Sequence, residues 1–533
     1  MRAILVLIVL AGIVSTPASA IHPNQPQGFD ADRAVQRGLD QIDQVDLFSG
    51  RLSIALPLGP FALVYNSNIW RYEIIMEEEE ERIRAGVDPQ NTGGLGWRLD
   101  LGEVYRPQHP YNVTGRWLFV SDDGGRHVFY DTLHNDDDNA VAGVWYTRDG
   151  SYLRLTKSTS FYVDIEFPDG TTRRFLTGAA TDPSVFRLHK VWSRFASADD
   201  PDLWVTRDAA DLERTVHDRY GRRHTIRLTD EFAPRFPRTV TQVDIEAFGG
   251  DRLIYDFEYW DRWVDVSCKQ SSVSSPNRIR VPHLKRIDNR GNDTAYTFTE
   301  DGALLYYNIC QGGIEDLPGI LRGINLPTGG KIRYVFQEYE FPPAESNSVF
   351  NSSAGVASRT LLNADDTPYG DGASTWAYKT TKKSAAETGE HPEMHTEVVN
   401  PTGDCSRHFF DAVYWRSTAT GEGWERGLPF TYTQHVASPG SAVRYLSQQI
   451  FSTSDGAGSC AGDLLRSVYL RLRHDALPGP SAPLSDWTNL NRQVQASRVV
   501  FHDDAGRYAD TEWSDFDGLG HFRRTVTTGS FRS

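Results

Sequence analysis

A short turn-and-strand unit recurs along this chain, and it constrains the fold more than any other feature. Each unit has an Asp-containing turn with Gly and a nearby basic residue, followed by an aromatic or β-branched segment. Gly supplies the positive φ that tight turns need, and Asp bonds to the backbone two residues on. One such unit cannot bury its own face, so its repetition predicts an extended β-sheet. The residues that define the units are Asp218, Tyr220, Gly221 and Arg222; Asp288 and Gly291; Asp504, Gly506 and Arg507; and Asp517, Gly518 and Gly520.

Composition and hydrophobic patterning predict the same class of fold. Aromatic residues make up 12% of the 533 residues, and 45 Gly and 27 Pro provide many turns. Apolar and polar residues alternate in the segments 161–167, 253–259 and 331–336, which places one sheet face on a core and the other in water. We therefore expect an all-β protein of antiparallel hairpins that serves as a scaffold, a shell or a binding surface.

The N-terminus has the pattern of a secretory signal peptide. A short basic start, an apolar stretch from Ala3 to Val14 and the cleavage pattern Ala18-Ser19-Ala20 assign residues 1–20 to it. The mature chain then begins at Ile21, and no later segment is long and apolar enough to span a membrane. The net charge of −16 disfavours nucleic acid and anionic lipid as partners.

The remaining chain divides into four parts by composition. Residues 21–110 form an N-terminal β region, in which Glu73 to Arg84 is predicted to be a solvated helix because it contains five successive glutamates, Glu77–Glu81. Residues 111–342 form a β-repeat region, and residues 343–393, rich in small and polar residues, are predicted to be a loop or linker. Residues 394–533 form a second β-repeat region that continues or is truncated.

The four cysteines predict disulfide bonds, because an exported chain enters an oxidising compartment. Three pairings are possible, and we favour the sequence-local one, Cys268–Cys310 with Cys405–Cys460. The segment 458–462 also has the outline of a hydrolase nucleophile elbow with Cys in place of Ser. That elbow needs a strand–turn–helix context, which a Gly-rich loop does not provide.

Other candidate sites have weaker patterns. His391 and His395 are four residues apart, and the acidic loops 135–139 and 363–372 carry oxygen ligands, but none has the spacing of a known metal motif. No metal or other cofactor is therefore predicted. Trp260, Trp263 and Trp415 are candidates for stacking on sugar rings, although aromatic residues in sheets more often belong to the core.

The motifs together resemble the amino-terminal part of RHS/YD-repeat proteins. The family's repeat centres on Tyr-Asp followed by Gly and often Arg, and the nearest forms here are 218–222, 504–507 and 516–521. The segments 46–59 and 94–97 also look like stretches that precede such arrays. Phe516 stands where the family has Tyr, the spacing between units is irregular, and the family's C-terminal core segment and toxin tail are absent.

This resemblance implies a function as well as a fold. Antiparallel strands would spiral into a shell or cocoon that encapsulates or presents a C-terminal payload. The expected partners are the remainder of a longer RHS polypeptide or its toxin payload, and the expected location is extracellular or at the cell surface, with the periplasm as an alternative. The chain is not expected to be an enzyme. Two alternatives remain: a cell-surface module that binds polysaccharide, and a secreted hydrolase.

Overall fold

A computed structural model describes residues 42–531 of the chain, with the internal gaps given below. Residues 1–41 and 532–533 lie outside it, and so does the predicted signal peptide. Among the described residues, all regular elements are strands, and none is a helix long and apolar enough to cross a membrane. The internal gaps are 48–49, 68, 78–79, 89, 113, 136, 138, 178–182, 234–235, 266–277, 301–305, 309–318, 341–351, 371–373, 384–392, 412–444, 456–457, 474, 476–490, 492 and 519–520.

The first described strands form a small sheet that we call the inner sheet. Its order is β1-β2-β3-β6, and all of its pairings are antiparallel. Alternate residues of the second strand, from Leu52 to Leu58, are fully buried, as the period-two pattern predicts. The Gly59-Pro60 turn joins the second and third strands. The strands are β1 (Asp43–Val45), β2 (Leu52–Leu58), β3 (Phe61–Asn66) and β6 (Trp97–Arg98).

The prediction of a helix over residues 73–84 is wrong. The segment belongs to a two-stranded antiparallel ribbon, β4 (Trp70–Glu77) and β5 (Glu80–Val87), with Glu77 opposite Glu80 at the tip. A glutamate run must stay in water, but the tip of a hairpin meets that need as well as a helix does. The isoleucines of the same segment, and Trp70 and Tyr72 just before it, favour strands.

The next strands, β7 to β14, close into an eight-stranded barrel. Each strand pairs antiparallel with the next, and β14 returns to pair with β7, where Phe186 lies opposite Val104. Side chains fill the interior, as expected for a barrel of this size. Phe119, Phe175 and Phe186 are fully buried there. The strands are β7 (Glu103–Tyr105), β8 (Leu118–Val120), β9 (Arg126–Tyr130), β10 (Val144–Thr147), β11 (Arg154–Thr156), β12 (Tyr162–Glu166), β13 (Thr172–Thr177) and β14 (Val185–Trp192).

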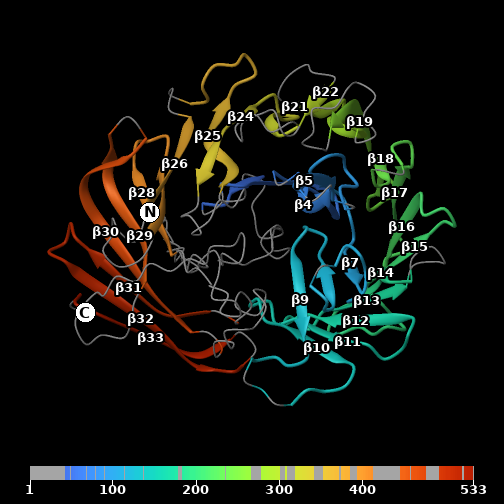
Figure 1. Cartoon of the computed structure of the whole chain (residues 1–533), viewed down its shortest axis with the longest axis horizontal. Coiled ribbons are helices and arrows are strands. Elements are labelled where there is room, and N and C mark those ends of the chain that lie inside the picture. Colours follow the sequence, from blue (N-terminus) through green and yellow to red (C-terminus); the bar gives the residue numbers. More distant parts are fainter. Residues whose placement is uncertain are drawn as a thin grey trace, which may run out of the picture.

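The strand β14 also pairs with β15, and from there the chain builds one continuous antiparallel wall, β15 to β33. Short β22 departs from the pattern by pairing parallel with β19, so that β21 pairs with β23. The strands follow one another around a ring with the blue N-terminal strands inside it (Figure 1). The strands are β15 (Leu203–Arg207), β16 (Glu213–Asp218), β17 (Arg223–Thr229), β18 (Thr239–Glu246), β19 (Arg252–Asp265), β20 (Arg278–Asn289), β21 (Thr294–Glu300), β22 (Tyr306–Asn308), β23 (Leu321–Asn325), β24 (Lys331–Glu340), β25 (Ser352–Leu362), β26 (Thr375–Lys383), β27 (Glu393–Val399), β28 (Cys405–Asp411), β29 (Tyr445–Ser454), β30 (Cys460–Arg473), β31 (Gln493–Phe501), β32 (Arg507–Phe516) and β33 (Phe522–Gly529).

The prediction of a loop or linker over residues 343–393 is also wrong. Strands β25 and β26 occupy much of it, and the pairings β24–β25, β25–β26 and β26–β27 carry the sheet through without a break. Ser and Thr suit a wall whose outer face meets water, and Thr has a high strand propensity. Val356 of this segment is fully buried and belongs to the core, although the segment as a whole is polar.

The inner sheet is attached to the wall by both apolar packing and hydrogen bonds. Its buried residues share one core with residues of β17 to β25. The backbone N–H of Val356 donates to the carbonyl of Gly50 at 2.8 Å, and that of Leu321 donates to the hydroxyl of Tyr65 at 3.0 Å. Gly50 has a φ of +70°, and a Cβ there would come within 2.4 Å of Gly355 Cα, so only glycine allows this approach.

The far end of the wall meets the barrel at a polar contact that we call the seam, made by Leu133, His134 and Arg148 on one side and by Asp475 and Asn491 on the other. The backbone N–H of Asn491 donates to the carbonyl of Arg148 at 2.7 Å, and its side chain donates to the carbonyl of Leu133 at 2.9 Å. His134 Nδ1 lies 2.9 Å from Asp475 Oδ1. Segments more than 300 residues apart in sequence thus meet, and the ring closes in space (Figure 1).

Candidate functional site

The recurring Asp-Gly units form turns between strands of the wall, as predicted. At the β16–β17 turn, the buried Asp218 accepts hydrogen bonds from the backbone of Tyr220 at 2.9 Å and of Arg222 at 3.0 Å. The Arg222 side chain donates to the same carboxylate at 2.6 Å, and Gly221 has a φ of +84°. The unit is a local device in which the acid fixes the turn, Gly permits it and Arg neutralises the acid.

The other units follow this pattern to different degrees. Asp504 and Asp517 bond to Arg507 and His521, three and four residues on, and Gly506 and Gly518 have positive φ. Gly520 lies outside the described residues. Asp288 is different, because its carboxylate accepts from Arg286 within the same strand. Asn289 instead caps this turn by accepting from the backbone of Gly291, and Asp293, not Gly291, has the positive φ.

The last strands of the wall form a single layer with both faces accessible to solvent. In β31 only Ala496 is buried, and seven of the eight residues of β33 are exposed. A sheet without a core must be stabilised by strand pairing and by contacts between neighbouring side chains on each face. This property suits the enclosing wall of a shell.

Arginine–carboxylate pairs that lie directly opposite one another on adjacent strands supply such contacts. Arg498 donates to both oxygens of Asp510, at 2.7 and 2.6 Å, and its guanidinium stacks 4.6 Å from the ring centre of Tyr508. Arg174 binds Asp164 in the same bidentate way and contacts Tyr162. A one-residue slip of register would move these partners to opposite faces, so the pairs specify the register. Opposite pairs of this kind are Arg154–Glu166, Arg174–Asp164, Arg187–Glu103, Arg227–Glu213, Arg407–Glu397 and Arg498–Asp510.

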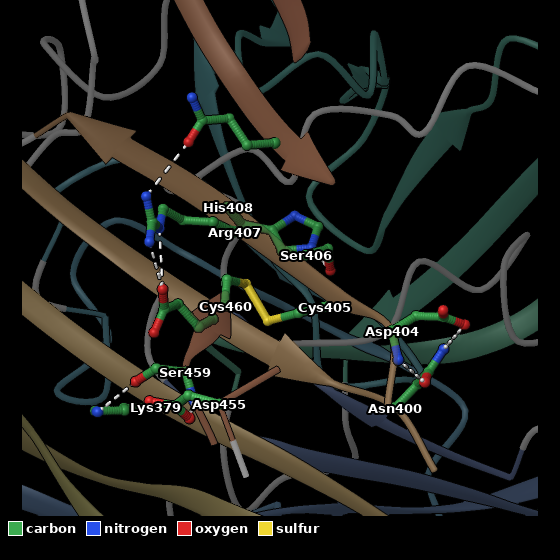
Figure 2. Close-up of a disulfide and its surroundings, with 12 residues drawn as sticks. Lys379, Asn400, Asp404, Cys405, Ser406, Arg407, His408, Asp455, Ser459 and Cys460 are labelled. Carbon is green, nitrogen blue, oxygen red and sulfur yellow. Dashed lines mark hydrogen bonds and ion pairs between the residues drawn. A yellow bond between two sulfur atoms is a disulfide. The ribbon is translucent and has the colours of Figure 1, made fainter. Parts of the chain in front are cut away.

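A disulfide bond joins Cys405 to Cys460, which confirms half of the predicted pairing. Cys268 and Cys310 lie outside the described residues. The bond, drawn in Figure 2, joins the first residue of β28 to the first residue of β30, two strands further along the sheet. Because it is oxidised and lies in a hairpin, Cys460 does not form a hydrolase elbow.

The disulfide holds the tip of the β29–β30 hairpin against the face of the wall. The side chain of Lys379 donates to Ser459 at this tip, although Lys379 lies in β26, three strands from β29 in the sheet (Figure 2). The backbone N–H of Ser459 is also bonded to Asp455 at 2.9 Å. The tip therefore crosses β28 and β27, and the disulfide is the covalent part of this overlap.

The predicted stacking residues do not form one aromatic platform. Trp263 is 48% exposed, whereas its neighbour Val264 is fully buried. Trp260 shares the face of Val264, because side chains alternate along β19 and the register shift in this strand precedes Trp260. Trp260 and Trp263 thus lie on opposite faces, and Trp415 lies outside the described residues.

The predicted acidic loops use their oxygens for local bonds. The Asp365 carboxylate accepts from the backbone of Thr367 at 3.2 Å, and Asp366 pairs with Lys331 at 2.7 Å. Asn135 accepts from Arg148 at 2.9 Å. Within the described ranges, no three His, Cys, Asp or Glu side chains gather as metal ligands. His395 is buried in β27, and His391 lies outside the described residues.

Exposed aromatic rings instead cluster on hairpin turns along one edge of the wall. Phe195, Tyr220 and Phe248 are 83%, 72% and 71% exposed. They belong to the β14–β15, β16–β17 and β18–β19 turns, which all lie at the same edge because strands alternate in direction. The rings of Tyr220 and Phe248 are 6.1 Å apart, and Arg222 stacks on Phe248 at 3.9 Å. Sequence reasoning missed them because exposure depends on the register of each turn.

A buried polar cluster at one end of the barrel also escaped prediction. His127 Nδ1 lies 2.7 Å from Asp149, and Ser121 donates to Asp123. Burial raises the pKa of Asp123 to about 6, the negative charge of Asp122 adds to this, and the hydrogen bond from Ser121 opposes it. Burial also acts to raise the pKa of Asp149, but the neighbouring His127 outweighs it, so the pKa of Asp149 is lowered.

The chain has no match among protein-family models and none among curated proteins. Similar solved structures include the crystal structure of TcdB2-TccC3-Cdc42, with 10% identity and a TM-score of 0.25, covering 91% of this chain and 36% of that one. The pore of the Photorhabdus luminescens Tc holotoxin with a TccC3 mutation has 10% identity and a TM-score of 0.27, covering 96% and 36%. The chain spans about a third of the length of these matches. TM-scores of this size establish no common fold, and the β architecture rests on the strand pairings described above.

Proposed function

We propose that the chain is an exported YD-repeat-like scaffold that forms part of a β shell and encloses or presents a polypeptide payload. The observation that supports this best is the continuous antiparallel wall from β15 to β33, which curves back to the barrel at the seam. A wall with both faces accessible separates two volumes of solvent without needing a core of its own.

The attachment of the inner sheet supports the same function. It packs on the inner side of β17 to β25 and leaves the inner side of the later strands to other contacts. Backbone hydrogen bonds and the ion pair between Asp43 and Arg359 hold it in place. Such a sheet would brace the half of the shell that it packs against. Any enclosed polypeptide would then have to occupy the other half.

A protease-protection experiment tests enclosure. A small, protease-sensitive reporter is fused after Ser533 and, as the matched control, before Ile21 of the mature chain. If the wall encloses a polypeptide joined to its C-terminal end, the reporter after Ser533 should be cleaved at least tenfold more slowly than the control. Equal cleavage rates would contradict enclosure. We also propose that the isolated chain has no catalytic turnover, which a broad panel of hydrolase substrates tests directly.

A second candidate function is surface recognition of polysaccharide. It is favoured by the exposed aromatic edge of Phe195, Tyr220 and Phe248, because exposed aromatic rings can stack on sugars. Retention on a glycan array that is lost in a Tyr220→Ala/Phe248→Ala variant would support it. Equal glycan binding by the variant and the wild type would exclude this edge as the binding site.

A further inference from the structure

Arg98, in β6 of the inner sheet, is buried without an acidic hydrogen-bond partner among the described residues. It is only 6% exposed. Its Nη1 donates to Gln90, but its Nε and Nη2 have no hydrogen-bond acceptor in the part of the chain that the structure describes. An unpaired buried guanidinium is costly, because a charge removed from water must be compensated by a partner.

The two unpartnered nitrogens form one functional edge. Nε–H and Nη2–H point in parallel and together match the two oxygens of a carboxylate or another oxyanion. This chain uses the same edge elsewhere for that purpose. Arg174, Arg359 and Arg498 each direct Nε and Nη2 at the two oxygens of an aspartate.

The acids near Arg98 are bonded to other partners. Asp100, 9% exposed, and Asp122 are close enough to Arg98 to interact with it electrostatically. Asp100 lies 3.7 Å from Arg214 and accepts from the backbone N–H of Leu101, and Asp122 accepts from Arg173 at 3.0 Å. Within the described part of the chain, neither carboxylate accepts a hydrogen bond from Nε or Nη2 of Arg98.

The hydrogen-bond inventory favours an anion over a water molecule. The two atoms of Arg98 that lack a partner among the described residues, Nε and Nη2, are both donors. Water would accept both of these bonds but would bring two new donors into the same buried region. An oxyanion only accepts, and it also neutralises the charge of Arg98.

We propose that Arg98 is the anchor of a buried oxyanion site at strand β6 of the inner sheet. The ligand is a small carboxylate or an inorganic oxyanion such as phosphate or sulfate, held bidentately by Nε and Nη2. The site does not depend on the proposed shell function.

Thermal unfolding at constant ionic strength tests the site. Chloride is replaced in turn by acetate, sulfate and phosphate, which separates organic carboxylates from inorganic oxyanions. We expect at least one oxyanion to raise the Tm of the wild type saturably by about 2 °C or more over chloride. Arg98→Met should lose this rise. Arg498→Met is the matched control, because Nε and Nη2 of Arg498 already donate to Asp510. This variant should keep the rise.

Two further measurements make the outcome decisive. If the ligand is too tightly held to exchange, the wild type is first desalted and then denatured to release it. Ion chromatography should then detect about one oxyanion per chain. If Arg98→Met does not fold, Arg98→Lys keeps the positive charge without the two parallel N–H donors. It should need at least tenfold more oxyanion to reach half of its maximal rise in Tm. The proposal is overturned if the wild type shows neither a saturable rise nor a released oxyanion, or if all variants respond alike.

Discussion

Removal of the Cys405–Cys460 disulfide should loosen the β29–β30 hairpin more than any other part of the wall. The bond closes a loop of 55 residues, and the chain-entropy relation for a loop of this size gives about 4 kcal/mol. Much of this should appear locally, because the tip is otherwise held to the wall by polar contacts such as that between Lys379 and Ser459. We take about 4 kcal/mol as the upper limit for the Cys405→Ala/Cys460→Ala variant.

Hydrogen exchange followed by mass spectrometry is the suitable assay, since a chain with several structural units need not unfold in one step. Protection in residues 458–463 should fall by up to about three orders of magnitude, the equivalent of the lost free energy. The barrel strands β7 to β14 should keep their protection and serve as the internal control. Added reductant should reproduce the effect in the wild type and change nothing at this hairpin in the variant. Unchanged protection at the hairpin would refute the view that the disulfide holds the tip.

Three more perturbations test particular contacts. Burial raises the pKa of Asp123 to about 6, so the folded state loses stability as the pH rises from about 4 to 6 and this carboxyl ionises. Asp123→Asn should therefore raise the free energy of unfolding at pH 7 by about 1 to 3 kcal/mol in urea unfolding, with no gain at pH 4. Burial lowers the pKa of His408 to about 4, so that between pH 6.5 and 4 only the unfolded chain takes up a proton and the wild type loses stability as the pH falls. His408→Gln should remove this loss, and an unchanged pH profile of Tm would contradict the reasoning. Phe175→Ala, in the barrel interior, should cost about 3 to 5 kcal/mol in urea unfolding, whereas Phe161→Ala, 70% exposed, should cost less than about 0.5 kcal/mol; similar losses in both would disprove the filled barrel.

The strand class and its turns could be predicted from the sequence because both are local properties. The unit at Asp218 contains its own acid, glycine and arginine within five residues, and the structure closes it as a turn. The same local reasoning failed at Glu77–Glu81, where a charge run is compatible with a hairpin tip as well as a helix. Over residues 343–393 it failed because a thin wall tolerates polar strands that resemble a linker.

The long-range features could not be predicted, because each depends on partners distant in sequence. The barrel closes only when Phe186 meets Val104, and no local pattern marks that pairing. The positions of Trp260 and Trp263 on opposite faces depend on where the register shift in β19 falls. Arg98 looks like any strand residue until the fold buries it and leaves its Nε and Nη2 without an acceptor among the described residues.

The alternation of direction along the wall has a consequence for how such a protein can change length over evolution. Inserting one strand would reverse every downstream strand and carry the turn with Tyr220 or Phe248 to the other edge. Inserting a whole hairpin leaves all later turns where they were. Growth or loss in this lineage should therefore occur in steps of two strands, with an odd step tolerated only at the terminus.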